Sequence, residues 1–179
     1  MNRMRILLLM ICCMASLHAS KPQPQVVDDV DLDRYAGLWF EIARIPNRFQ
    51  SQCAKGTTAR YALMDNGQIR VVNRCYKEDG SQDSVTGVAR VVDEKTNARL
   101  EVSFVRFLGR NWFWGDYWII GLDENYKWAV VGHPERKYGW ILSRSPEIPD
   151  ALRQRIDALL EKQGYDPAAF VDTPAFEKK

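Results

Sequence analysis

The feature that most constrains this fold is a series of eight short β-rich segments, separated by turn signals at nearly regular spacing. Their side chains alternate between apolar and polar, as Leu100, Val102 and Phe104 do with Glu101 and Ser103. Such alternation is typical of strands with one buried face. The predicted strands cover residues 38–45, 57–63, 69–76, 85–92, 100–107, 117–122, 128–132 and 139–143.

Short turns between consecutive strands predict that neighbours in sequence pair antiparallel, so the fold class is all-β. We expect an eight-stranded up-and-down antiparallel β-barrel, whose lumen holds side chains or one small ligand. After the eighth predicted strand, the spacing of the apolar residues changes from that of a strand to that of a helix. Residues 149–163 place Leu152, Ile156 and Leu160 on one face and end before Gly164, which predicts one C-terminal amphipathic helix packed outside the barrel.

The first twenty residues have the three-part layout of a secretory signal peptide: a basic start, an apolar run and a small polar end. A frayed amphipathic N-terminus is the alternative. Arg3 and Arg5 are the only charged residues of this leader, so 23 basic and 23 acidic residues remain after its removal. A net charge of zero leaves no basic field for nucleic acid. We divide the chain into a signal peptide (1–20), a linker (21–29), a barrel domain (30–173) and a tail (174–179).

Two pairs of cysteines have different expected roles. Cys12 and Cys13 lie in the leader, where a lipid anchor is poorly supported because bulky residues precede Cys12. Cys53 and Cys75 lie in the body, and export favours one disulfide between them over two buried thiols. The straight cross-strand partner of Cys75 would be near Thr58, so the pairing requires the preceding loop to curl back.

Three short motifs should meet at one end of the barrel, because alternate turns of a meander share an end. They are Gly37 with Trp39, Asp123 with Tyr126, and Arg144 after the last strand. A tryptophan can plug one end of a small barrel. An arginine on its face would add a cation–π contact and donors for nearby turn carbonyls.

These motifs resemble the three short motifs of the lipocalin family, over roughly residues 30–173. The longer sequence segments around Trp39 and from Trp140 to Arg144 are similar to those of the bacterial outer-membrane (Blc-type) lipocalins and of apolipoprotein D. The resemblance implies structural roles for the five motif residues and a ligand in the lumen. It also implies fatty acids or lysophospholipids as the ligand class, and a periplasmic protein associated with the outer membrane.

The opposite end should carry function. Its long loop contains Arg110 and the aromatic run from Trp112 to Trp114. One interpretation is a rim that admits a lipid tail or touches a membrane. The alternatives are that some of these rings cap the core, or that the loop is the docking patch of an interaction protein.

Strand alternation and the loops at the open end give the predicted ligand contacts. If Trp39 points inward, Glu41 and Ala43 should follow, unless a β-bulge reverses them. Tyr117 and Trp140 are our preferred lumen residues near the mouth, with plain core packing as the alternative. The predicted ligand contacts are Tyr117, Trp140, Glu41, Phe49, Trp112 and Trp114.

Catalysis has little support in this sequence. His133 is the single histidine after the leader, so a Ser-His-Asp triad would have to pass through a turn. No His/Cys metal spacing and no phosphate-binding glycine loop is present, so we expect no catalytic residues, metal or cofactor. A lipid-acting enzyme is the remaining enzymatic alternative. The expected partner is a fatty acid or lysophospholipid, bound by a monomer or homodimer.

Overall fold

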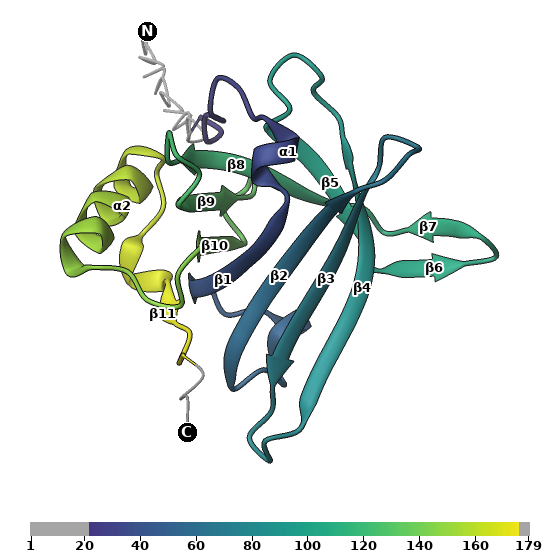
Figure 1. Cartoon of the computed structure of the whole chain (residues 1–179). Coiled ribbons are helices and arrows are strands. Elements are labelled where there is room, and N and C mark those ends of the chain that lie inside the picture. The colour runs from purple at the N-terminus through teal and green to yellow at the C-terminus, as the bar shows by residue number, and fades with distance from the viewer. Residues whose placement is uncertain (1–21, 176–179) are drawn as a thin grey trace, which may run out of the picture.

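The computed structural model describes residues 22–175. The predicted signal peptide, Cys12, Cys13 and the last four residues lie outside this range. Within it, eight antiparallel strands close into a barrel (Figure 1), with the order β10-β9-β8-β5-β4-β3-β2-β1 and a further pairing of β10 with β1. The barrel strands are β1 (Gly37–Arg44), β2 (Lys55–Leu63), β3 (Ile69–Tyr76), β4 (Gln82–Val91), β5 (Arg99–Ser103), β8 (Gly115–Leu122), β9 (Trp128–Gly132) and β10 (Gly139–Ser143).

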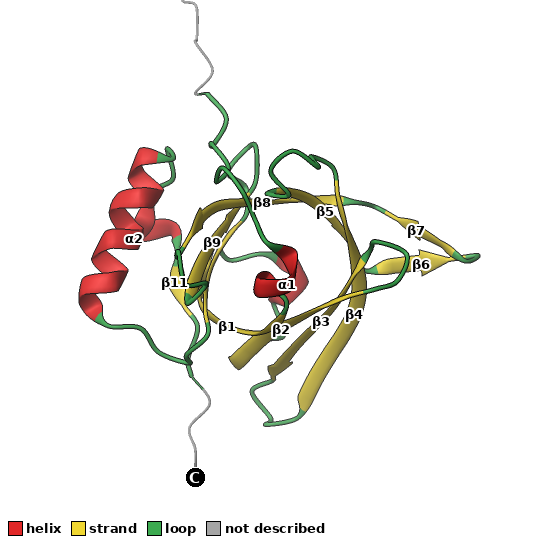
Figure 2. Cartoon of the chain, turned by 45° about the horizontal axis from the view of Figure 1, so that its top comes forward, coloured by secondary structure: helices red, strands yellow, loops and turns green. Residues whose placement is uncertain are grey.

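Helices cover one end and one side of this barrel. The short α1 (Leu32–Tyr35) lies within the ring of strands in the view of Figure 2, at one end of the barrel. The predicted C-terminal helix is α2 (Asp150–Lys162), and it packs outside the strands. The remaining short elements are η1 (Arg48–Gln50), η2 (Pro167–Ala169) and β11 (Val171–Asp172), which pairs with the end of β1.

Two hydrophobic clusters share the barrel wall. The inner cluster fills the closed half of the barrel around Trp39 and Ile119, and the outer cluster lies between the wall and Ile156 of α2. Ala43 belongs to the outer cluster, so the expectation that it points inward with Trp39 and Glu41 is wrong. The reason is a β-bulge between Glu41 and Ala43, which reverses the alternation.

The fifth predicted strand, 100–107, is also wrong in its second half. Strand β5 ends at Ser103, and the chain then forms a separate hairpin from β6 (Val105–Phe107) and β7 (Arg110–Trp112). Leu108 and Gly109 form its two-residue turn with φ of 49° and 76°. Positive φ at both turn residues is the geometry that closes tight hairpins, so local pairing replaces the expected long strand.

Candidate functional site

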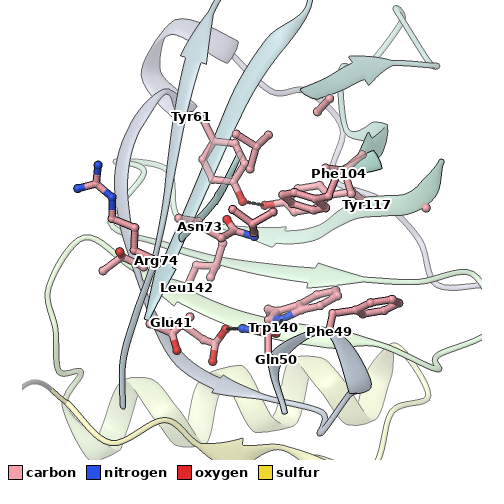
Figure 3. Close-up of a pocket in the computed structure, with 18 of the residues that line it drawn as sticks. Glu41, Phe49, Gln50, Tyr61, Asn73, Arg74, Phe104, Tyr117, Trp140 and Leu142 are labelled. Atoms are coloured by element: carbon pink, nitrogen blue, oxygen red, sulfur yellow. Dashed lines mark hydrogen bonds between the residues drawn. The ribbon is translucent and has the colours of Figure 1, made fainter. Parts of the chain in front are cut away.

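One end of the barrel opens into a cavity of about 680 Å³. This lies within the roughly 300–1,000 Å³ of pockets that enclose small ligands. Inward-facing residues of β2, β3, β5, β8 and β10 form its walls, and the loop with η1 covers part of the mouth (Figure 3). Its apolar wall includes Ala59, Ile69, Val71, Leu100, Val102 and Leu142.

Trp39 and Arg144 close the other end. Trp39 is fully buried, and its Nε1 donates to the Tyr35 carbonyl at 2.8 Å. The Arg144 guanidinium lies 3.8 Å from the centroid of the Trp39 ring system. It donates hydrogen bonds to the carbonyls of Arg34, Tyr35, Ala36, Leu38 and Tyr126. The plug is therefore both packed and hydrogen-bonded.

Gly37, Asp123 and Tyr126 support this plug. Gly37 has a φ of +101°, and a Cβ added there would lie 3.2 Å from Arg144 Nη1. The Asp123 carboxylate accepts the backbone N–H groups of Asn125 and Lys127. The Tyr126 hydroxyl accepts from the backbone N–H of Asp31 at 2.8 Å. The structure thus brings all three motifs together, away from the cavity mouth.

Three tyrosine hydroxyls meet on the floor of the cavity. The Tyr117 hydroxyl lies 2.8 Å from that of Tyr35 and 2.9 Å from that of Tyr61 (Figure 3 draws the second contact). Burial raises the pKa of Tyr61 to about 12 and the pKa values of Tyr35 and Tyr117 well above their usual range. All three phenols are therefore neutral hydrogen-bonding groups. Tyr117 faces the lumen as predicted, but it lies deep beside α1 rather than near the mouth.

Glu41 is held by a hydrogen-bonded network at the edge of the cavity. Its carboxylate accepts from Arg44 Nη1, Thr173 Oγ1 and Gln50 Nε2, each at 2.6 Å. Gln50 in turn accepts from Trp140 Nε1 at 2.9 Å. The network ties η1 to β1 and β10, so Glu41 fixes the covering loop instead of presenting a free acid to the lumen.

An aromatic wall lines one side of the mouth. The Tyr138 ring lies 5.5 Å from Phe49, 5.3 Å from His133 and 6.1 Å, stacked, from Trp140, between ring centroids. All four side chains line the cavity. Burial lowers the pKa of His133, although Asp116, 3.9 Å away, opposes this. The wall therefore offers an apolar, mostly uncharged surface.

Two polar side chains of the lining lack partners. Thr57 Oγ1 and Asn73 Oδ1 are buried without a hydrogen bond to any described residue. Asn73 lies between Val71 and Cys75 on the inward face of β3. A buried polar atom without a partner is costly, so this site has unused hydrogen-bonding capacity half-way along the cavity.

No lysine or arginine side chain of the described lining points into the cavity. Arg74 borders the cavity, but its side chain points away from it (Figure 3). The carboxylate of Asp83 accepts from Gln52 Nε2 at 3.0 Å, across the mouth. An anionic group of a ligand would thus find no ion-pair partner inside the cavity.

The predicted disulfide is present and holds the covering loop. Cys53 and Cys75 are bonded, with their Cα atoms 5.5 Å apart. The loop curls back as required, since the Cys53 N–H donates to the Gln50 carbonyl and its own carbonyl accepts from Arg44 Nη2. The disulfide therefore fastens η1 to β3 at the mouth.

The structure separates the two predicted loop tryptophans from the cavity lining. Trp112 lies on β7 with about half of its surface exposed, and Trp114 lies under Arg90, whose guanidinium carbon is 4.2 Å from the ring centroid. Phe113, between them, borders the mouth. Of the six predicted contacts, Glu41, Phe49, Tyr117 and Trp140 line the cavity, and Trp112 and Trp114 do not.

Sequence reasoning missed five residues that shape the cavity: Tyr35, Gln50, Tyr61, Asn73 and Tyr138. Asn73 carried a usable signal, because it interrupts the apolar face formed by Ile69, Val71 and Cys75. Tyr61 is two residues after Ala59 on the same strand, so alternation places both side chains on the inward face. Gln50 and Tyr35 had no such signal, since their roles depend on how loops fold over the barrel ends.

No group of three or more His, Cys, Asp or Glu side chains within residues 22–175 could hold a metal ion. No helix in that part of the chain is long and apolar enough to cross a membrane.

Comparison with known proteins places the chain among proteins of this architecture. A family model described as a lipocalin-like domain matches residues 30–175. The outer membrane lipoprotein Blc of Escherichia coli K12 is 39% identical over 157 residues, covering 85% of each chain. Mouse apolipoprotein D is 32% identical over 161 residues, covering 84% of this chain and 80% of its own. Among solved structures, insecticyanin from Manduca sexta superposes with a TM-score of 0.69 at 23% identity, covering 89% of this chain and 86% of its own.

Proposed function

The chain belongs to the lipocalin family, and on this basis we propose that it binds small amphiphilic lipids, of the fatty acid or lysophospholipid class, for storage or transport. The observation that carries the proposal is the cavity of about 680 Å³, apolar in its wall, open at one end and plugged by Trp39 at the other. Such a space can bury an acyl chain out of water, which is the main favourable term for lipid binding.

The ligand should enter chain first. No lysine or arginine side chain of the described lining points into the cavity, so a charged head group is best left in solvent at the mouth. The aromatic wall of Phe49, Tyr138 and Trp140 would pack against the first part of the chain. Asn73 would meet a hydroxyl, ester or bound water further in, because its amide has no partner in the protein.

We also propose that this activity lies in the cell envelope, in the periplasm and close to the outer membrane. Three observations support the location. The leader has the layout of a secretory signal peptide, and the Escherichia coli relative is named an outer membrane lipoprotein. The predicted Cys53–Cys75 disulfide, present in the structure, fits an oxidising compartment.

We propose a binding protein and not an enzyme. The His133 ring faces the Glu135 N–H, which donates to Nδ1 at 3.1 Å, and the Asp116 carboxylate. Within residues 22–175, no serine, threonine or cysteine side chain forms a hydrogen bond to this ring, so the geometry of an activated nucleophile is missing.

The test is a titration of the purified protein with a fluorescent fatty acid, with unlabelled lysophospholipid as competitor. We expect saturable binding that Trp140→Ala weakens about tenfold or more, because a large aromatic contact is lost from the lumen wall. Trp112→Ala is the matched control, since Trp112 does not line the cavity, and should leave the affinity unchanged.

Two outcomes would count against the proposal. Absence of saturable binding by the folded wild-type protein, for both ligand classes, would refute lipid binding. Equal weakening by Trp112→Ala and Trp140→Ala would move the site out of the lumen. Mass spectrometry of an organic extract of the purified protein would then show whether another ligand occupies the cavity.

A further inference from the structure

A projecting hairpin lies at the open end of the barrel. It consists of β6, β7 and their flanks, residues 104–115, and we call it the mouth hairpin. Its two strands form a sheet of their own and project away from the barrel (Figures 1 and 2). Apolar side chains dominate its surface: Phe107 is 63% exposed, Leu108 85% and Phe113 82%. Soluble proteins rarely present large apolar residues so fully and so close together.

The backbone of the mouth hairpin holds two of these side chains outward. Leu108 and Phe113 have φ of 49° and 58°, in the left-handed region that bulky residues seldom adopt. Glycine or asparagine would fill such positions at lower cost. Apolar residues that are both strained and exposed break two local rules at once, which is expected at functional positions.

The base of the mouth hairpin is fixed to the barrel. Ser103 Oγ, which is buried, donates to the Trp112 carbonyl at 2.6 Å. Phe104 packs over Gly87, where an added Cβ would lie 2.6 Å from the Phe104 ring. Trp114 is covered by Arg90. The tip is thus presented on a rigid base.

The mouth hairpin carries a positive charge, which favours a negatively charged partner. Residues 104–115 contain Arg106 and Arg110 and no acidic residue. Aromatic side chains together with arginine are the composition that favours the interface of a lipid bilayer, and cations favour anionic head groups. Phe104, Val105 and Phe113 also line the cavity mouth, so the apolar surface is continuous from the tip into the lumen.

We propose that the mouth hairpin docks the protein on a bilayer that carries anionic lipids, with Leu108 and Phe113 inserted and the cavity mouth facing the membrane. This gives a lipid chain an apolar route between bilayer and lumen. The docking surface reaches from the tip of the mouth hairpin to the rim of the cavity, and its binding to a bilayer does not depend on which ligand the lumen holds.

The test is flotation of the purified, non-acylated protein with vesicles of phosphatidylcholine, with and without phosphatidylglycerol. We expect Leu108→Ser/Phe113→Ser to weaken binding to the anionic vesicles at least about tenfold, because two large apolar contacts are lost. Leu63→Ser/Val92→Ser is the matched control, since these residues are 41% and 50% exposed outside the mouth hairpin, and should bind like the wild type. Arg110→Gln should weaken binding to the anionic vesicles about fivefold.

Three outcomes would overturn the proposal. The first is no flotation of the wild-type protein with either vesicle, and the second is equal loss in the control variant. The third is a concentration-dependent dimer that Leu108→Ser/Phe113→Ser abolishes without any vesicle binding, which would assign the surface to a second copy of the chain. Fluorescent fatty acid titration without vesicles separates this result from the lumen proposal: Leu108→Ser, whose side chain does not line the cavity, should keep the lumen affinity of the wild type.

Discussion

The two ends of the barrel are built on opposite principles. At the closed end, Arg144 uses its donors on five backbone carbonyls and covers a fully buried Trp39. At the open end, Asn73 has no partner and Phe113 is exposed to solvent. The contrast indicates that the closed end contributes stability, while the open end keeps unsatisfied groups available for a ligand or a surface.

Alanine replacements of one tryptophan at each end give the largest expected contrast. Trp39→Ala leaves a hole in a packed core, and we expect the free energy of unfolding to fall by about 3–5 kcal/mol. Trp140→Ala removes a partly exposed wall residue, so its cost should be about 1–2 kcal/mol. Urea unfolding followed by circular dichroism measures both. A larger loss for Trp140→Ala than for Trp39→Ala would contradict the assignment of stability to the closed end.

Removing the disulfide tests whether the open end depends on a covalent clasp. Cys53 and Cys75 are 22 residues apart, so Cys53→Ala/Cys75→Ala should lower the free energy of unfolding by about 3 kcal/mol, mainly through the unfolded chain. Because the bond fastens the loop over the mouth, we also expect faster ligand release in stopped-flow displacement. A reductant should reproduce the loss in the wild type and leave the variant unchanged. Unchanged stability on reduction would show that Glu41 and Gln50 hold the loop without the bond.

The tyrosine cluster lies at the boundary between the two ends and makes stability sensitive to high pH. Burial raises the pKa of Tyr61 to about 12, from about 10 in the unfolded chain. Its stabilisation is therefore complete below pH 10 and is lost as the pH rises from about 10 to 12, a loss of about 2–3 kcal/mol for this group alone. Tyr61→Phe should flatten this part of the profile of unfolding free energy against pH. An equally steep fall in the variant would show that the phenol of Tyr61 is not the cause.

The sequence predicted the closed end better than the open end, for a physical reason. Strand alternation and turns specify a meander, and a meander dictates that Gly37, Trp39, Tyr126 and Arg144 converge. The disulfide also followed from the two cysteines and the export signal. These inferences need only the order of elements and the period of the side chains.

The open end depends on local irregularities that periodicity does not encode. A bulge after Glu41 moved Ala43 to the outer face. The turn at Leu108 converted half of a predicted strand into a projecting hairpin. Gln50 lies in a loop and belongs to the site because its side chain forms hydrogen bonds with Glu41 and Trp140. No strand pattern predicts such contacts. Sites made by loops and broken strands therefore require the three-dimensional structure.

Asn73 gives the smallest and most specific test of the contrast between the ends. Its buried Oδ1 has no partner, so Asn73→Leu should raise the free energy of unfolding by up to about 1 kcal/mol. Asn47 is the control, because its side chain accepts from the N–H groups of Phe49 and Gln50 and donates to the Ile45 carbonyl. Asn47→Leu should lower the free energy of unfolding by about 1 kcal/mol.

Asn73→Leu should also change the ligand preference of the cavity. A chain that carries a hydroxyl half-way along, as ricinoleate does and oleate does not, can satisfy the Asn73 amide. We expect Asn73→Leu to weaken ricinoleate about fivefold relative to oleate, because one buried hydrogen bond contributes about 1 kcal/mol. Displacement of the fluorescent fatty acid by each ligand measures this ratio. If Asn73→Leu destabilises the protein and leaves the ratio unchanged, the amide is a structural group satisfied by water, and the open end is no less complete than the closed one.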